Sequence, residues 1–185
     1  MSGIGFPVAL SLEVATLATL LLSVPATWLG FVLARKRFFG RALVDAVVLL
    51  PLVLPPSVTG YILMLLFGRG GLLGAPLHRA TGLALPFTFT AAVIAACAVA
   101  LPLFVKTAQA AFSHVSLDLE ETAYTLGLSP RRTFFAITLP LARRGLLSAA
   151  VLAFARAAGE FGATLIFAGN IPGRTNTTAL ELQTA

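Results

Sequence analysis

Long apolar stretches separated by short polar segments make up most of this sequence. A helix needs roughly 20 apolar residues to cross a hydrocarbon core about 30 Å thick. Four stretches reach that length, at about residues 8–34, 43–67, 87–105 and 145–168. The pattern therefore predicts an all-α fold, a polytopic transmembrane helical bundle that forms one domain over residues 1–185.

The composition excludes an ordinary water-soluble domain. Hydrophobic residues make up 58% of the chain and charged residues only 11%, whereas soluble domains carry about 25% charged residues. The net charge of +6 could indicate nucleic-acid binding. The charges, however, lie beside the apolar stretches, so we expect the lipid bilayer as partner and no nucleic acid.

The basic residues predict the orientation of the chain in the membrane. Most of them flank two connections: Arg35, Lys36, Arg37 and Arg41 in the first, and Lys106, Arg131, Arg132, Arg143 and Arg144 in the segment 106–144. Only Arg69, Arg79 and Arg174 fall in the other polar segments. Because basic residues are retained on the cytoplasmic side, both connections are predicted to be cytoplasmic and the N-terminus outside, in a multi-pass protein of the cell (plasma or inner) membrane.

The sequence offers little for metal or thiol chemistry. Cys97 is the only cysteine, and His78 and His114 lie in different connections, so we expect no metal site and no cofactor. The first apolar run lacks a basic n-region and a small-residue cleavage site, which indicates a retained span rather than a signal peptide.

The second apolar stretch contains an unusual number of helix-breaking residues. The run "LPLVLPPSVTGY" holds three prolines and a glycine, and a broken segment is tolerated in a membrane only against protein or beside a watery path. Two interpretations stay open, a kinked helix in a tight bundle and a segment that lines a pathway. The candidate pathway residues here are Pro55, Pro56, Thr59 and Gly60.

One long polar segment, within residues 106–144, is predicted to form a helix, a turn and a second helix. The first helix is expected over Leu117–Leu126, with Asp118, Glu120 and Glu121 in its first turns, where the helix dipole favours acids. Gly127 suits the left-handed end of that helix, and Ser129 and Pro130 suit the start of the next, which we expect to stop before Pro140. An apolar ridge follows the hairpin: Ala123, Leu126, Phe134, Phe135 and Ile137.

The same segment carries a family resemblance. Glu121-Thr122-Ala123 is followed after three residues by Gly127 and after nine more by Ile137-Thr138-Leu139-Pro140. This spacing resembles the E-A-A…G…I-x-L-P pattern in the cytoplasmic loop of ABC importer permeases, with Thr122 where alanine is usual. The resemblance implies a type I ABC permease-like fold and a loop that docks on a cytoplasmic ATPase subunit. The residues to which it gives this coupling role are Glu121, Thr122, Ala123, Gly127, Ile137, Leu139 and Pro140. From the residues alone, an amphipathic helix lying on the bilayer remains the alternative.

Two further stretches narrow the resemblance to one subfamily. "LPLVLPPSVTGYILMLLFGRGGLLG" (50–74) and "FARAAGEFGATLIFAGNIPGRTNT" (154–177) are similar to the molybdate and tungstate permeases. The resemblance implies a second permease copy, two copies of an ATPase subunit and an extracytoplasmic oxyanion-binding protein. It also implies a fifth span after Thr177, so we expect the 185 residues to be an incomplete permease.

The fourth apolar stretch holds ionisable residues at membrane depth. Arg156 and Glu160 are four residues apart, which predicts that they lie on one helix face, and Ser148 and Thr164 are expected on the same face. Intramembrane charges are costly and mark candidate functional sites. A structural ion pair and a gate or anion-path role both remain open for Arg156, Glu160 and Thr164. A second stripe, Ala155, Gly159 and Ala163, predicts close helix packing.

Several functions compete at this point. The leading hypothesis is a permease subunit that couples ATP hydrolysis on a partner chain to alternating access for molybdate or tungstate. The chain has no G-x-x-x-x-G-K-[ST] phosphate loop, which agrees with a subunit that is not itself an enzyme. Alternatives are a sulfate or thiosulfate permease, a membrane assembly subunit without transport, and an intramembrane enzyme. The last would need a nucleophile–base pair or metal cluster, and the spans contain no histidine and no aspartate pair.

Overall fold

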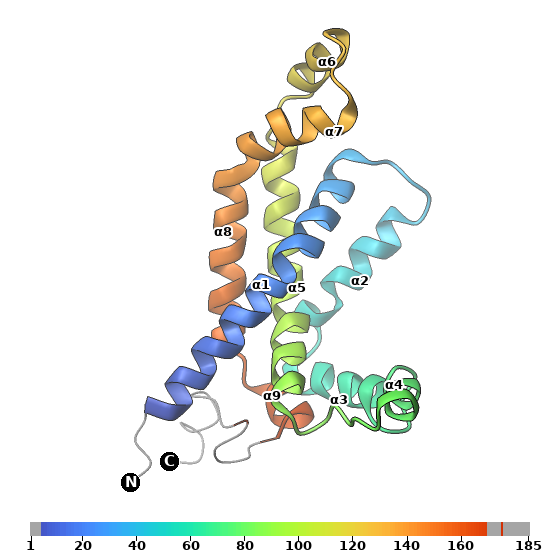
Figure 1. Ribbon diagram of the computed structural model, residues 1–185, viewed down its shortest axis with the longest axis vertical. Helices are drawn as coiled ribbons and strands as arrows, with labels where there is room; N and C mark the ends of the chain where they lie inside the picture. Colours follow the sequence, from blue (N-terminus) through green and yellow to red (C-terminus); the bar gives the residue numbers. More distant parts are fainter. Residues whose placement is uncertain (1–4, 170–174, 176–185) are drawn as a thin grey trace.

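The computed structural model describes residues 5–169 and residue 175, and the described residues are helical with no β-strand (Figure 1). The predicted all-α class is therefore confirmed. Three helical stretches are long and apolar enough to cross a membrane: Pro7–Arg35, Phe89–Ser113 and Pro130–Ala158. A fourth span exists only if the bent pair Arg41–Val53 and Pro56–Phe67 counts as one.

The bundle is built around α5 (Phe89–Ser113), against which both α1 (Gly5–Arg35) and α8 (Leu139–Ala158) pack. The buried side of α5 is rich in alanine, which lets neighbouring helices approach closely. The fully buried residues of α5 include Ala91, Ala95, Ala96, Val99, Ala100 and Ala108. The last turns of α5 extend through Lys106, which the sequence had predicted to begin the polar segment. Lys106 Nζ there pairs with the Asp45 carboxylate of α2 (Arg41–Val53).

The second predicted span is not one helix. It divides into α2 and α3 (Pro56–Phe67), whose axes differ by 118°. Leu54 and Pro55 adopt extended backbone conformations at the break. Two consecutive prolines remove two N–H donors, and a residue that precedes proline avoids the helical region. The chain then continues through α4 (Gly74–Thr81), and α3 and α4 lie at the same end of the molecule (Figure 1).

The fourth predicted span, 145–168, is also wrong as a single helix. It ends as α8 at Ala158, and a short α9 (Gly162–Phe167) follows after Gly159, Glu160 and Phe161. Glycines at 159 and 162 weaken a helix, and the Glu160 carboxylate binds the start of α9. The predicted packing stripe is divided by this break, because Ala155 and Gly159 are exposed while Ala163 is buried. Ser148 and Thr164 consequently do not share one helix face.

At the other end of the molecule, α6 (Leu117–Thr125) and α7 (Pro130–Thr133) project beyond the ends of α1, α5 and α8 (Figure 1). A π-helical segment, η1 (Phe134–Thr138), joins α7 to α8. The expected stop before Pro140 is wrong, because Pro140 lies in the first turn of α8. The wider π turn changes the hydrogen-bond register just before this proline, so its missing N–H falls where a new helical stretch begins.

Candidate functional site

The turn between α6 and α7 has the geometry that its sequence predicted. Gly127 has a φ of 84°. Its N–H donates to the Tyr124 carbonyl over 3.0 Å, and the Leu128 N–H donates to the Ala123 carbonyl over 3.0 Å. These two bonds form the Schellman ending of a helix. The Ser129 hydroxyl then accepts from the Arg132 N–H, so the predicted N-cap is confirmed.

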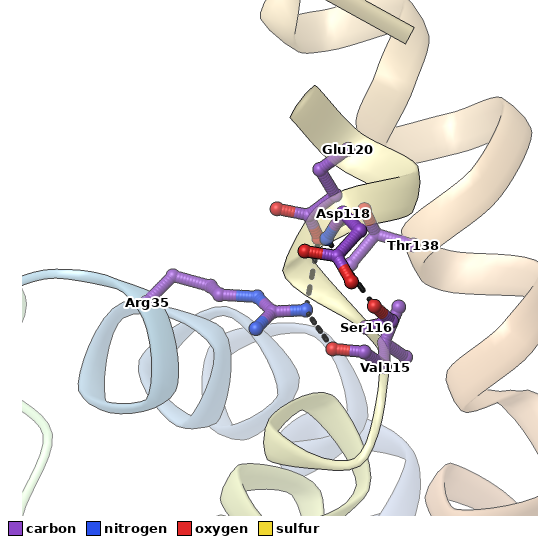
Figure 2. A network of polar contacts seen from close by, with 6 residues as sticks. All are labelled: Arg35, Val115, Ser116, Asp118, Glu120 and Thr138. Carbon is purple, nitrogen blue, oxygen red and sulfur yellow. Dashed lines mark hydrogen bonds and ion pairs between the residues drawn. The ribbon is translucent and has the colours of Figure 1, made fainter. Parts of the chain in front are cut away.

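A buried ion pair fixes this hairpin to the membrane helices (Figure 2). Arg35, the last residue of α1, donates from its Nη2 to Glu120 Oε1 over 3.0 Å and to the Val115 carbonyl over 2.8 Å. The Thr138 hydroxyl donates to the same Glu120 oxygen over 2.7 Å. Only 9% of the Arg35 side chain and 10% of the Glu120 side chain is exposed. One carboxylate thus joins α6 to α1 and to the end of η1.

The sequence interpretation missed this pair. It used Arg35 only as a marker of orientation and Glu120 only as an acid in a first helical turn. One signal was available, because Glu120 lies three residues before Ala123 and therefore on the same face of α6 as the apolar ridge. An acid on a face that packs against protein needs a partner. The partner itself, 85 residues away in the sequence, could not be read from spacing.

The residues of the E-x-A…G…I-x-L-P pattern divide into outward and inward groups. Glu121, Thr122, Gly127 and Pro140 are exposed, whereas Ala123 is buried and Ile137 and Leu139 are half-buried. The predicted ridge divides in the same way. Leu126 is 75% exposed and Phe135 is 67% exposed. Phe134 instead turns inward, and its ring centroid lies 4.8 Å from that of Phe31 on α1.

The structure also brings the predicted intramembrane charges together. Arg156 Nη1 lies 2.8 Å from Glu160 Oε2, and the other carboxylate oxygen of Glu160 accepts the Ala163 N–H over 2.7 Å. The Glu160 side chain is 1% exposed, and the Arg156 side chain is 26% exposed. Glu160 therefore binds a free N–H at the start of α9 and also neutralises the charge of Arg156. The pair itself is confirmed, while its role in transport stays a prediction.

The breaks in the second and fourth apolar stretches meet at this pair. A cavity of about 370 Å³ is lined by Pro56 and Ser57 from the start of α3 and by Arg156, Glu160 and the residues around them from the second break. Deeper in the same contact, an added Cβ on Gly60 would lie 2.8 Å from the Ala163 carbonyl oxygen. Only a glycine permits so close an approach of α3 and α9.

The other predicted pathway residues lie outside this cavity. Pro55 is exposed at the helix break, and Thr164 is buried in α9. Thr59 is buried on α3, and its hydroxyl has no hydrogen-bond partner among the described residues. Of the predicted pathway set, Pro56, Arg156 and Glu160 therefore share one cavity. Part of the subfamily resemblance lay in residues 170–174, 176 and 177, which are outside the described residues. The segment after Thr177, where a fifth span was expected, is also outside them.

Comparison with known proteins identifies the family. The family described as "Binding-protein-dependent transport system inner membrane component" matches residues 26–184. This chain belongs to that family. The match includes the α6–α7 hairpin, the break between α2 and α3, and the break between α8 and α9. It confirms the type I ABC permease fold that the sequence predicted.

Similar proteins within this permease family carry a more specific name. The molybdenum transport system permease protein ModB of Haemophilus influenzae is 45% identical over 94% of this chain and 76% of its own length. The protein of that name from Escherichia coli is 45% identical over 92% and 74%, and the one from Azotobacter vinelandii is 43% identical over 95% and 77%. The chain is thus a membrane permease related to molybdenum transport permeases, and the relatives named here are transport system permease proteins.

Proposed function

We propose that this protein is the membrane-spanning subunit of an ATP-driven importer for molybdate or tungstate. In this proposal residues 1–185 act as one permease domain, and a cytoplasmic ATPase subunit hydrolyses ATP. Two permease copies, two ATPase copies and an extracytoplasmic oxyanion-binding protein make up the importer. The names of the relatives support the substrate class, and the absence of a phosphate loop in the sequence supports a separate ATPase.

The observation that carries the proposal is the way in which the α6–α7 hairpin is fixed. The hairpin projects from the bundle (Figure 1), and Leu126 at its turn is exposed. The buried Arg35–Glu120 pair ties its base to α1, and η1 connects it without a loop to α8. A partner that moves the hairpin would therefore move two membrane helices with it. We assign the contact with the ATPase to Glu121, Thr122 and Gly127 and their neighbours, on the cytoplasmic side.

At the other end of α8, the same movement would reach the two helix breaks. Because α8 leads directly to Arg156 and Glu160, a shift of α8 changes the contact between α3 and α9. We propose that this contact opens and closes during alternating access. A single arginine beside a carboxylate would attract a passing dianion only weakly. Weak attraction favours transport, because a tightly bound anion would be released slowly.

The test is ATP-dependent uptake by the reconstituted importer. The permease is purified with its ATPase and binding protein, placed in liposomes, and supplied with labelled molybdate. The proposal predicts uptake that requires ATP and falls when unlabelled molybdate or tungstate is added, but not with equal sulfate. Uptake that sulfate blocks equally well would contradict the substrate assignment, and a stable complex without any uptake would contradict transport.

A further inference from the structure

A second cavity, of about 280 Å³, lies between the end of α1 and the α6–α7 hairpin. Its lining combines aromatic side chains, among them Trp28, Phe31 and Phe135, with the cations Lys36 and Arg131. Glu120 also lines it, but Arg35 and Thr138 already occupy that carboxylate. Neither Lys36 nor Arg131 has an ion-pair partner among the described residues. The cavity therefore carries two uncompensated positive charges beside an apolar wall.

An exposed apolar face leads along α1 directly to this cavity. Residues 17, 21, 24 and 28 follow the i, i+4, i+7, i+11 spacing of one helix face. Their exposed fractions are 41% for Leu17, 62% for Leu21, 77% for Val24 and 65% for Trp28. Trp28 is at once the last residue of this face and a wall of the cavity. An elongated apolar group lying on α1 would thus reach the two cations at its end.

From this arrangement we propose that the cavity binds the head group of an acidic phospholipid, whose acyl chains lie on the exposed face of α1. The cavity is close to the lower limit of small-ligand pockets, about 300 Å³, so it has room for a head group and not for a whole lipid. Basic pockets beside the cytoplasmic ends of membrane helices attract anionic lipids. Trp28 lies where an aromatic ring is favoured at a membrane interface.

The charges around the cavity favour a lipid over a soluble anion. Further cations follow Lys36 and Arg131 in both segments, apart from the buried and paired Arg35: Arg37, Arg41 and Arg132. Five basic residues without an ion pair among the described residues, near one membrane surface, give the surface attraction that holds anionic lipids. The apolar lining offers a small hydrated anion little to replace its water, whereas it suits the acyl chains next to a lipid head group. The inference rests on the cytoplasmic orientation proposed above, and it does not require transport activity.

Lipid binding can be measured on the full-length permease by native mass spectrometry. The protein in detergent is titrated with phosphatidylglycerol, and phosphatidylcholine with the same acyl chains serves as the neutral comparison. The site variant is Lys36→Gln with Arg131→Gln. Its matched control is Arg37→Gln with Arg132→Gln, which removes two positive charges one residue further along each segment, both outside this cavity.

The expected result is a loss of phosphatidylglycerol affinity of about thirtyfold in the site variant, from two head-group contacts. The control should stay within about threefold of the parent, and phosphatidylcholine binding should not change in either. Trp28→Ala keeps every charge, and it should weaken phosphatidylglycerol binding about fivefold through the lost aromatic contact.

Three outcomes would overturn the inference. Equal losses in the site variant and the control would mean that charge near the membrane acts without a defined site. Unchanged phosphatidylglycerol binding in the site variant would exclude the cavity as the lipid site. Unchanged lipid binding together with lost ATPase co-purification would assign the cavity to the partner protein instead. Lipid binding is measured without ATP or oxyanion. The experiment therefore tests the lipid site even if the transport proposal fails.

Discussion

Removal of one partner of the Arg35–Glu120 pair should detach the α6–α7 hairpin from the bundle. The perturbation is Glu120→Leu, which is close in size and leaves the Arg35 guanidinium without its carboxylate. Both side chains are about nine-tenths buried, and the pair is 3.0 Å long. Arg35 would keep only the Val115 carbonyl as an acceptor among the described residues.

The magnitude follows from the burial of these groups. Breaking a buried ion pair by removing one partner costs about 3–5 kcal/mol, because the remaining charge stays in a poorly solvated place. The Thr138 hydroxyl also loses its acceptor, and an unsatisfied buried hydroxyl costs about 1–3 kcal/mol. These costs overlap and do not add. Even the lower value of about 3 kcal/mol raises the population of the detached hairpin about 150-fold.

Hydrogen–deuterium exchange can measure this effect locally. We expect faster exchange in α6 and η1 of Glu120→Leu, with little change in the centre of α5. The double variant Arg35→Leu with Glu120→Leu should recover much of the protection, since no charge is then stranded. Arg37→Leu removes a neighbouring arginine that makes no ion pair among the described residues, and it should exchange like the parent. Parent-like protection in Glu120→Leu would refute the reasoning.

Three further predictions concern other parts of the molecule. Gly127→Val should cost about 1–2 kcal/mol, because a side chain resists the left-handed backbone at φ 84°, and it should lower both ATPase co-purification and uptake. Arg156→Leu and Glu160→Leu should each reduce the yield of the assembled complex through a stranded buried charge, about 3–5 kcal/mol, while the double variant should assemble again. Gly60→Ala should lower the midpoint of thermal unfolding, because its Cβ would lie 2.8 Å from a backbone oxygen of α9 and overpacking costs about 1–3 kcal/mol.

Each of these predictions has its own control or contrary outcome. Gly70→Ala places a Cβ in open space and should change neither stability nor uptake. If Gly127→Val co-purifies with the ATPase and transports normally, the hairpin is not the docking site. A double Arg156 and Glu160 variant that assembles but transports poorly would assign the arginine to the anion path. Should both single variants assemble and transport like the parent, the pair has neither role. An unchanged unfolding midpoint in Gly60→Ala would mean that α3 and α9 separate easily.

Local chemistry in the sequence predicted the hairpin well and the continuity of the helices poorly. Gly127 and Pro130 act through their own backbone preferences, and Ser129 acts through its hydroxyl oxygen, which accepts a hydrogen bond from the backbone N–H three residues later. Their positions alone therefore specify a turn. The prediction at Pro140 was wrong because the effect of this residue is not set by its own backbone preference alone. The effect of a proline depends on the hydrogen-bond register around it, and the π segment before Pro140 is not visible in a pattern of residue types.

The two helix breaks and the buried pair show where spacing ceases to be informative. An apolar run of residues 145–168 has the composition of a span whether or not it bends, and the bend depends on how Glu160 meets the backbone of α9. Arg35 and Glu120 are joined only because α1 ends beside α6. Hydropathy predicts that helices exist, but the contacts between them depend on packing across the bundle.

Site-specific crosslinking tests the central claim, that the hairpin is the cytoplasmic contact with the ATPase. In a Cys97→Ala background, Leu126→Cys carries a photo-activated crosslinker at the turn of the hairpin. Leu72→Cys is the control, since Leu72 is 82% exposed and belongs to the connection between α3 and α4, two helices at the opposite end of the molecule from α6 and α7 (Figure 1). The account predicts a crosslink between position 126 and the ATPase subunit, and none from position 72. No crosslink from position 126 in an assembled, transporting complex would contradict it.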